Sequence, residues 1–300
     1  MISAALIAVD WGTTSARAYR IGHNGQVLDQ RSGPYGIAQL APVDFAAALR
    51  GLLGDWSDDP APRIACGMIG SRQGWREAPY VPCPASLQAL ADGLVEVEGL
   101  SIVPGLITRD ARGTPDVLRG EETQLLGAIA PDEPRVVAVL PGTHSKWAIV
   151  EQGIVVDFQT FMTGELYAVL LAHSILGRMA KALPTEAAGP AFERGLRHGL
   201  ESDTVTHDLF AARTLALTGE LASTDVEPWL SGLLIGCEIR SALPWSALRS
   251  HDTPLRVIGD AALCQRYLAA LQLASARAEP GPTDAAARGL WRIGQERLLR

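Results

Sequence analysis

The sequence predicts an α/β fold built from two related domains. Its first residues read as a strand–turn–strand–turn–strand meander, because a short apolar run is followed by alternating segments with Gly-containing turns between them. The same order returns at residues 135–159, and helical patterns occupy much of the remaining chain. A length of 300 residues fits two domains of about 150 residues each.

The first meander begins with a buried strand at Ala4–Val9 that runs into Asp10. Gly12–Ser15 has the composition of a turn, and Ala16–Ile21 reads as a second strand. A Gly-His-Asn-Gly turn then precedes a third strand that starts at Val27. These segments predict an antiparallel start to the first domain.

The second meander has expected strands at Val136–Leu140, Lys146–Val150 and Ile154–Thr160. Its first turn, Gly142–Ser145, matches Gly12–Ser15 at a distance of 130 residues. An internal repeat of this kind favours a duplicated domain. The alternative is two unrelated hairpins that each carry a Gly-Thr turn.

The boundary of the duplication is expected near Pro131 and Pro134, which interrupt the chain before the second meander. We therefore expect an N-terminal domain over residues 1–130 that includes a substrate-binding insert. A C-terminal domain over residues 131–300 would carry the nucleotide-binding segments.

Helices are expected between and after the meanders at Phe45–Trp56, Ala85–Val97, Glu121–Ile129, Leu263–Leu273 and Ala285–Ile293. Gly232 and Gly236 are four residues apart and therefore share one face of a helix. The small residues of Asp284–Gly289 form a similar stripe. Both stripes predict close helix crossings.

Composition narrows the class of protein. The net charge is −7 and the basic residues are not clustered, which weighs against a nucleic-acid binder. The chain has no run of about 18–20 apolar residues, and its N-terminus lacks a basic leader, so we expect neither a membrane span nor a signal peptide. Four cysteines without a CxxC pair indicate free thiols in a reducing compartment, and we expect a cytoplasmic protein.

The turn after the first strand has the features of an anion site. Gly12 lets the backbone pass close to a bulky anion, and Thr13, Thr14 and Ser15 supply N–H groups and hydroxyls. Asp10 ends the strand and is a candidate Mg²⁺ ligand, because hard cations prefer oxygen donors. An ordinary β-turn is the alternative.

The second turn would bind another part of the same anion. Its candidate residues are Gly142, Thr143, His144, Ser145 and Lys146. Two such hairpins in a duplicated chain resemble the actin-like ATPases, and this resemblance implies ribonuclease H-like domains flanking an ATP cleft. Pro141 stands where many members of that superfamily have Asp, so a second carboxylate on the metal is not expected.

Two further segments fit the same resemblance. Gly259, between a strand and a helix, is similar to the adenosine-binding segment of the fold, although Asp260 replaces a small residue that is common there. Gly120-Glu121 is similar to a Gly-Asp helix start of glycerol kinase and its relatives, in which the Asp acts as the base. Glu121 and Glu122 are therefore the candidate catalytic carboxylates, with Glu121 preferred, and a dipole-stabilised pair of helix-start glutamates is the alternative.

Whole segments resemble the 2-dehydro-3-deoxygalactonokinase family across nearly the full chain. They are IAVDWGTTSARAY, CGMIGSRQGW, VPGL, RGEETQLLGA, LPGTHSKW, DFQTFMTGEL and SGLLIG. The resemblance implies ATP-dependent phosphorylation of 2-dehydro-3-deoxy-D-galactonate at its C6 hydroxyl. The expected substrate-binding residues are Ser71, Arg72, Trp75, Arg119, Thr163 and Glu165, with Arg72 or Arg119 on the carboxylate.

Four other functions are compatible with parts of the sequence. They are another sugar or sugar-acid kinase of the same fold, an actin-like phosphoanhydride hydrolase, a ribonuclease H-like nucleic-acid enzyme and a filament-forming protein. The acidic charge and the second hairpin weigh against the nucleic-acid enzyme. We expect the partners to be ATP and a sugar acid, without nucleic acid or membrane, and a homodimer is one assembly that the sequence allows.

Overall fold

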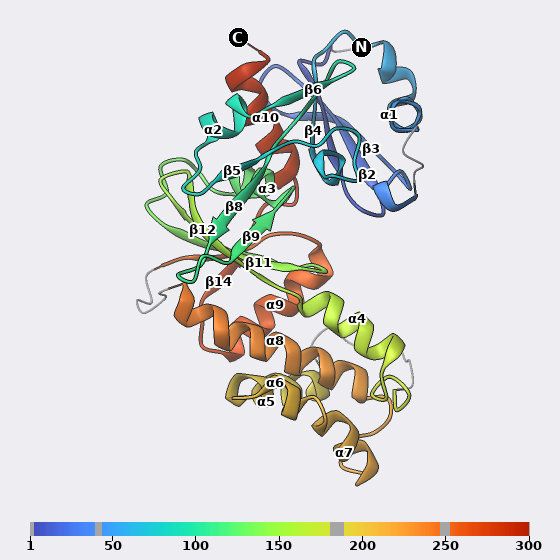
Figure 1. The fold of residues 1–300 in the computed structure, drawn as a ribbon, viewed down its shortest axis with the longest axis vertical. Coiled ribbons are helices and arrows are strands. Elements are labelled where there is room, and N and C mark those ends of the chain that lie inside the picture. Colours follow the sequence, from blue (N-terminus) through green and yellow to red (C-terminus); the bar gives the residue numbers. More distant parts are fainter. Residues whose placement is uncertain (1–2, 40–43, 181–188, 247–252, 300) are drawn as a thin grey trace. The chain divides into compact units, whose positions relative to one another are not determined.

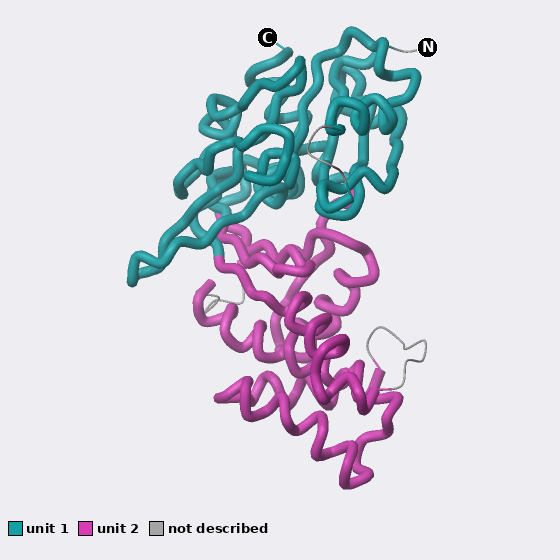
Figure 2. Tube along the Cα trace, turned by 45° about the vertical axis from the view of Figure 1, so that its right-hand side comes forward, with its two compact units in different colours: residues 1–134, 150–158, 284–300 teal, residues 135–149, 159–283 magenta. Residues whose placement is uncertain are grey.

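A computed structural model describes residues 3–39, 44–180, 189–246 and 253–299 (Figure 1). Contacts between Cα atoms divide the chain into two compact units (Figure 2). Unit 1 comprises residues 1–134, 150–158 and 284–300, and unit 2 comprises residues 135–149 and 159–283. These units are defined by contacts and not by ancestry, so the duplication boundary near residue 130 stays a prediction.

The first sheet has six strands in the order β3-β2-β1-β4-β7-β6. Its strands are β1 (Leu6–Trp11), β2 (Ala16–Ile21), β3 (Val27–Gly33), β4 (Arg63–Gly67), β6 (Val95–Val97) and β7 (Leu100–Ile102). β1 pairs antiparallel with β2 and parallel with β4. All but one residue of β1 is buried, as its continuous apolar sequence predicts.

The second sheet repeats this order with five strands, β12-β11-β10-β13-β14. They are β10 (Val136–Leu140), β11 (Ser145–Glu151), β12 (Ile154–Phe161), β13 (Leu255–Val257) and β14 (Ala278–Pro280). In both sheets the first strand of the meander lies between its hairpin partner and a parallel strand from later in the chain. The predicted strands of both meanders are therefore confirmed.

A third sheet joins β5 (Tyr80–Pro82), β8 (Gly105–Arg109) and β9 (Pro115–Leu118) in the order β5-β8-β9. The helix predicted over Ala85–Val97 is wrong beyond Asp92. The helix there, α2, covers only Leu87–Asp92, and Val95–Val97 pairs with β7 instead. Gly93 follows α2, and the three residues after Leu94 gain ladder hydrogen bonds that a longer helix would forgo.

The remaining helices divide between the two units. Unit 1 contains α1 (Phe45–Leu53), α2, α3 (Glu121–Ala128) and α10 (Ala285–Arg297). Unit 2 contains α4 (Thr163–His173), α5 (Pro190–Glu201), α6 (Val205–Asp208), α7 (Ala211–Leu217), α8 (Val226–Trp245) and α9 (Ala261–Leu273). Short 3-10 turns cover Ile37–Gln39, Gly54–Asp58 and Met68–Gly70. Across the described residues, every helix is too short or too polar to cross a membrane.

Glycines let two helix pairs cross closely, one in each unit. In unit 2 a Cβ added at Gly232 of α8 would lie 2.1 Å from the carbonyl oxygen of Phe192 in α5. In unit 1 a Cβ at Gly289 of α10 would lie 1.9 Å from the carbonyl oxygen of Thr123 in α3. Both predicted small-residue stripes are thus confirmed as close crossings. The crossing in unit 1 fixes α3, which carries the candidate catalytic carboxylates.

Gly289→Ala should destabilise the protein by more than about 1 kcal/mol, although Ala is the better helix former, because its methyl group forces α10 away from α3. Gly189→Ala is the matched control, since that position has open space for a Cβ, and should cost less than about 1 kcal/mol. Urea unfolding measures both changes. Equal effects would mean that the close crossing does not limit stability.

Candidate active site

The carboxyl end of β1 places Asp10 beside the neighbouring strand β4. Asp10 is half-buried and pairs in register with Cys66, whose Sγ lies 3.8 Å from its Oδ1. Burial raises the pKa of Asp10 above its ordinary value, and the charge of Arg17 opposes this change. A carboxylate held at the end of a buried strand can accept a cation or a water molecule.

The turn that follows Asp10 is held by its backbone and exposes its side chains. The N–H of Gly12 donates to the carbonyl of Ser15 over 2.9 Å. Gly36 packs so closely on this turn that an added Cβ would lie 2.1 Å from the carbonyl carbon of Thr14. The side chains of Thr13, Thr14 and Ser15 are exposed, so their hydroxyls are accessible to a ligand.

The start of α3 gives its two glutamates different environments. Gly120 has φ +105°, a conformation that favours glycine, and it places Glu121 and Glu122 in the first helical turn. Glu121 is half-buried, and its Oε2 accepts a hydrogen bond from the N–H of Arg119 over 2.9 Å. Only Glu121 of the pair is open to solvent.

Glu122 is fully buried under the same turn. Its carboxyl group accepts hydrogen bonds from the N–H of Gly120, at 2.6 Å, and from the hydroxyl of Thr123, at 3.0 Å. Burial, followed by the charge of Glu121, raises the pKa of Glu122 to about 8. Glu122 is therefore mostly protonated at neutral pH and suits a structural role better than that of a base.

Asp10 of β1, Cys66 of β4 and Glu122 of α3 are titratable groups that lie close to one another. Burial raises the pKa of the Cys66 thiol, and the charges of Asp10 and Glu122 raise it further. Across the described residues no three His, Cys, Asp or Glu side chains are placed so that together they could hold a metal ion. One carboxylate is still compatible with Mg²⁺, because this ion is commonly bound by one or two carboxylates together with substrate phosphates.

Arg119 presents unsatisfied donors on the same unit. Its Nη2 donates to the carbonyl of Ala78 over 2.8 Å, and its guanidinium carbon lies 4.5 Å from the ring centroid of Tyr80. Its Nε and Nη1 are buried and have no hydrogen-bond partner among the described residues, as is also true of Ser71 Oγ. Buried donors of this kind normally have a partner, so these atoms are available to a bound ligand or to water.

Arg119 and Ser71 belong to adjoining segments. A Cβ added at Gly70 would lie 2.9 Å from Arg119 Nη1. The guanidinium therefore lies against the turn that leads into Ser71. Arg72 is exposed instead, and Trp75 stacks on Phe45 at 6.3 Å with the core of unit 1. Of the four substrate-binding candidates in unit 1, the structure places Arg119 against the turn that leads into Ser71 and packs Trp75 on the core.

The second hairpin lies in unit 2 and differs from the first in which side chains it exposes. Thr143 and His144 are exposed, whereas Ser145 and Lys146 are buried. His144 Nε2 contacts Glu165 Oε2, so these two predicted site residues are partners. Ser145 donates its hydroxyl to Glu238 over 2.7 Å. The hairpin can offer a ligand the backbone around Gly142 and Thr143, while its Ser145 side chain faces the protein interior.

A pocket of about 270 Å³ opens beside this hairpin. Its lining comes from the hairpin, α4, α8 and α9, namely Gly142, Thr143, Thr163, Gly164, Tyr167, Ser231, Leu234, Ile235, Leu263, Arg266 and Tyr267. The pocket combines an apolar wall with hydroxyl groups and an arginine, as expected of a small-molecule site.

Gly259 lies in the short connection between β13 and α9, in the position predicted for the adenosine segment. Its φ is +144°, which other residues rarely adopt, and an added Cβ would lie 3.6 Å from the carbonyl oxygen of Pro141. Asp260 caps α9 by accepting hydrogen bonds from the N–H groups of Ala262 and Leu263. The departure at Asp260 therefore has a local explanation as a helix cap.

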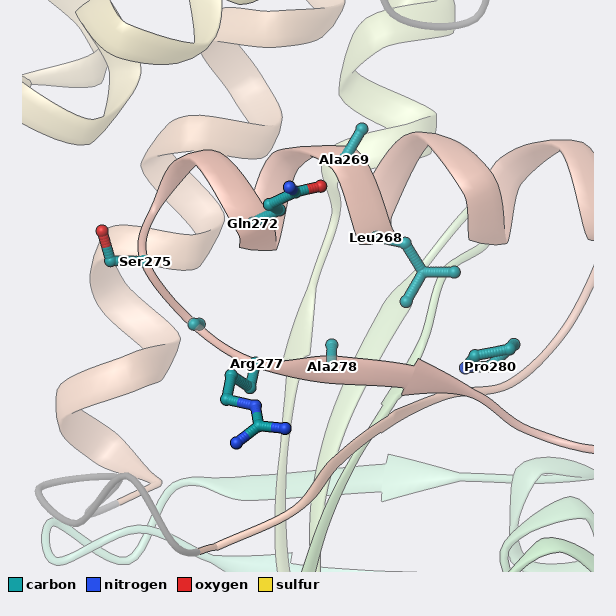
Figure 3. Close-up of a pocket in the computed structure, with 8 residues that line it drawn as sticks. Leu268, Ala269, Gln272, Ser275, Arg277, Ala278 and Pro280 are labelled. Carbon is teal, nitrogen blue, oxygen red and sulfur yellow. The ribbon is translucent and has the colours of Figure 1, made fainter.

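A second hollow of about 540 Å³ lies between α9 and β14 (Figure 3). It is lined by Leu268, Ala269, Gln272, Ser275, Ala276, Arg277, Ala278 and Pro280. Its residues include no carboxylate and none of the predicted site residues. We do not assign it to the reaction.

Sequence reasoning missed Glu238 and Tyr267. Both are buried in unit 2 and hydrogen-bonded to each other over 2.8 Å. A signal for Glu238 was present, because it is the one carboxylate within the apolar stretch of α8 from Leu230 to Ile239. A charged residue in such a stretch requires buried partners.

Glu122→Gln should become more stable relative to the unsubstituted protein as pH rises from about 5 to 8. The pKa of Glu122 lies above its ordinary value of 4.5, so its stabilising contribution is complete below pH 4.5 and is lost as pH rises through about 8. The difference in unfolding free energy should change by at most about 1.4 kcal/mol per pH unit. Denaturant unfolding at several pH values measures it, and a difference independent of pH would show that Glu122 titrates normally.

The family model and two relatives that match this chain in sequence all carry the name of one kinase family. A family model described as 2-keto-3-deoxy-galactonokinase matches residues 10–293. The chain is 37% identical over 273 residues to 2-dehydro-3-deoxygalactonokinase of Escherichia coli strain K12, with 90% of each chain covered. It is 39% identical over 301 residues to a probable 2-dehydro-3-deoxygalactonokinase of Rhizobium meliloti strain 1021, with 95% of this chain and 97% of the relative covered.

Solved structures agree on the fold. A crystal structure from Sinorhizobium meliloti, of a protein provisionally named 2-dehydro-3-deoxygalactonokinase, has a TM-score of 0.88 at 36% identity and covers 97% of this chain and 98% of that one. The activator of the 2-hydroxyisocaproyl-CoA dehydratase from Clostridium difficile has a TM-score of 0.51 at 10% identity, which is a likeness of fold alone. The predicted actin-like ATPase fold is confirmed.

Proposed function

The chain belongs to the 2-keto-3-deoxy-galactonokinase family, and from this premise we propose that it phosphorylates 2-dehydro-3-deoxy-D-galactonate with ATP. The acceptor is the C6 hydroxyl, and the products are 2-dehydro-3-deoxy-6-phosphogalactonate and ADP, in galactonate catabolism. The observation that carries this proposal is the match at 37% identity over 90% of both chains to the Escherichia coli kinase. The protein is thus a carbohydrate kinase, with ATP and a sugar acid as its small-molecule partners.

ATP binding is assigned to turns that follow strands in each unit. In unit 2 the backbone at Gly142 and Thr143, the neighbouring pocket and Gly259 suit a nucleotide, because the backbone approaches closely where a Cβ is absent. In unit 1 the exposed hydroxyls of Thr13 and Thr14 suit phosphate oxygens. Asp10 would hold Mg²⁺, which when bound neutralises charge on the phosphates.

Glu121 is assigned as the general base. It is the accessible carboxylate of the pair and lies in the first turn of α3, whereas Glu122 is buried and mostly protonated at neutral pH. A carboxylate that is open to solvent can accept the proton of an attacking hydroxyl. Glu122 contributes by fixing the turn through Gly120 and Thr123.

Glu121→Gln should lower kcat by about 10²- to 10⁴-fold with little change in KM for ATP, because the amide keeps the shape but cannot accept the proton. Glu122→Gln should lower kcat far less. Steady-state kinetics at pH 7 compares the two variants. The reverse order of effects would make Glu122 the base.

Arg119 and Ser71 are assigned to the substrate carboxylate and an adjacent oxygen. Nε and Nη1 of Arg119, which have no hydrogen-bond partner in the described part of the chain, each leave a donor for a substrate oxygen, and the Ser71 hydroxyl lies in the segment beside them. Tyr80 supports the guanidinium through its ring face. Arg72, exposed on the same turn, is the weaker candidate for this contact.

Arg119→Met should raise KM for the sugar acid by about 10- to 100-fold, since a charge-assisted hydrogen bond contributes about 1.5–3 kcal/mol. KM for ATP should change little. Arg72→Met is the matched control and should change KM for the sugar acid by less than about threefold. A larger increase in KM for Arg72→Met than for Arg119→Met would indicate that Arg72 binds the carboxylate.

The activity itself is tested by coupling ADP release to a fluorescent readout. The purified protein should release ADP when Mg²⁺, ATP and 2-dehydro-3-deoxy-D-galactonate are present together, and much less with the gluconate epimer. No stimulation by any 2-oxo-3-deoxy sugar acid would overturn the proposal. Equal ADP release without an acid would favour the phosphoanhydride hydrolase.

We also place the enzyme in the cytoplasm, where ATP is available. All four cysteines are free thiols in the structure, which supports a reducing compartment.

A further inference from the structure

Unit 2 contains a buried carboxylate that the proposed chemistry does not use. Glu238 of α8 is 3% exposed and accepts hydrogen bonds from four side chains. Its Oε1 accepts from Ser145 Oγ at 2.7 Å and from Trp147 Nε1 at 2.8 Å. Its Oε2 accepts from Tyr267 OH at 2.8 Å and from Thr163 Oγ1. Four donors match the four lone-pair directions of a carboxylate.

Burying a carboxylate requires desolvation free energy, and an apolar side chain of similar size could fill the same place without it. Burial raises the pKa of Glu238, and hydrogen bonds from Thr163, Trp147 and Ser145 oppose this change. The position is therefore better explained by what the carboxylate orients than by general stability. Its donors come from β11, α4 and α9.

These same elements surround the pocket beside the second hairpin. Thr163 and Tyr267 line the pocket and also donate to Glu238. Ser145 ends the hairpin, and Gly142 and Thr143 of that hairpin line the pocket. Glu238 is thus hydrogen-bonded to the hairpin, α4 and α9, three parts of the pocket, and is not itself a lining residue.

Backbone contacts connect the start of α4, where Thr163 lies, to the Gly142–Ser145 hairpin. The N–H of Glu165 donates to the carbonyl of Thr143 over 2.8 Å. A Cβ added at Gly164 would lie 2.3 Å from the carbonyl oxygen of Gly142, so the start of α4 rests directly on the turn. A shift of Thr163 must therefore move the hairpin backbone.

We propose that Glu238 is a positioning residue for ATP, which holds the Gly142–Ser145 hairpin and the start of α4 in the arrangement that binds the nucleotide. It acts through Ser145 and Thr163 and touches no reacting atom. This inference rests on the proposed kinase function. It predicts a defect confined to the nucleotide, because Ser71 and Arg119, the candidate residues for the sugar-acid carboxylate, belong to unit 1. Thr163, predicted from the sequence to contact the sugar acid, instead donates its hydroxyl to Glu238.

The test compares Glu238→Ala and Glu238→Gln in the full chain. Calorimetric titration with a non-hydrolysable ATP analogue should show at least tenfold weaker binding for the Ala variant. Its KM for ATP should rise in parallel, with KM for the sugar acid within about twofold of the unsubstituted value. The Gln variant should be intermediate, because its amide oxygen still accepts from Ser145 and Trp147 while the hydroxyls of Thr163 and Tyr267 turn to accept from its NH₂ group.

Two controls separate positioning from a general loss of stability. Leu255→Ala opens a cavity at the start of β13, the end of the strand away from Gly259, and should lower Tm while leaving binding of the analogue unchanged. Tyr267→Phe removes one donor and keeps the ring, and should weaken binding of the analogue by about two- to fivefold. It also serves as the test if Glu238→Ala does not fold.

The outcomes distinguish this inference from the proposed function. Unaltered binding of the analogue in Glu238→Ala, or in Tyr267→Phe if the Ala variant is unfolded, would overturn the positioning role in an active kinase. A parallel loss of affinity for both substrates would overturn it as well. Absence of ADP formation by the unsubstituted protein would instead reject the kinase function.

Discussion

The hydrogen bonds of the buried Glu238 carboxylate are the constraint on which the second unit depends. A carboxylate inside a protein is tolerated only when its oxygens are matched by donors, so the four side chains around it are fixed along with it. Through Ser145 and Thr163 these bonds reach the hairpin and the start of α4. Glu122 has a similar place in the first unit, where it accepts from Gly120 and Thr123 beneath the turn that presents Glu121.

Each unit therefore combines a packed structural support with an accessible turn. In unit 1 the support consists of β1, β4 and the close crossing of α3 and α10. The accessible groups are the hydroxyls after Asp10 and the carboxylate of Glu121. In unit 2 the support consists of β10, β11 and α8, and the accessible groups belong to Gly142 and Thr143. Kinases need this division, because positioning and charge stabilisation supply most of their catalysis.

Local sequence predicted the two meanders and their turns because apolar runs, alternation and Gly-containing turns are short-range signals. It also preferred Glu121 to Glu122, and the structure buries only Glu122, since adjacent helical positions face different directions. The role of Glu121 as the base stays a prediction. It failed where distant pairing decides the outcome: Val95–Val97 is a strand only because β7 pairs with it. The four donors of Glu238 lie between 29 and 93 residues away in sequence, and the orphan donors of Arg119 are visible only in the folded chain.

The site assignments all depend on transfer of a phosphoryl group from ATP to the C6 oxygen of a 2-oxo-3-deoxy sugar acid. Phosphorus NMR of the complete reaction with ATP, Mg²⁺ and 2-dehydro-3-deoxy-D-galactonate tests it most directly. We expect one phosphomonoester per ADP, with the phosphorus coupled to the two protons on C6. Inorganic phosphate as the sole new phosphorus species, or an ester at another carbon, would contradict it.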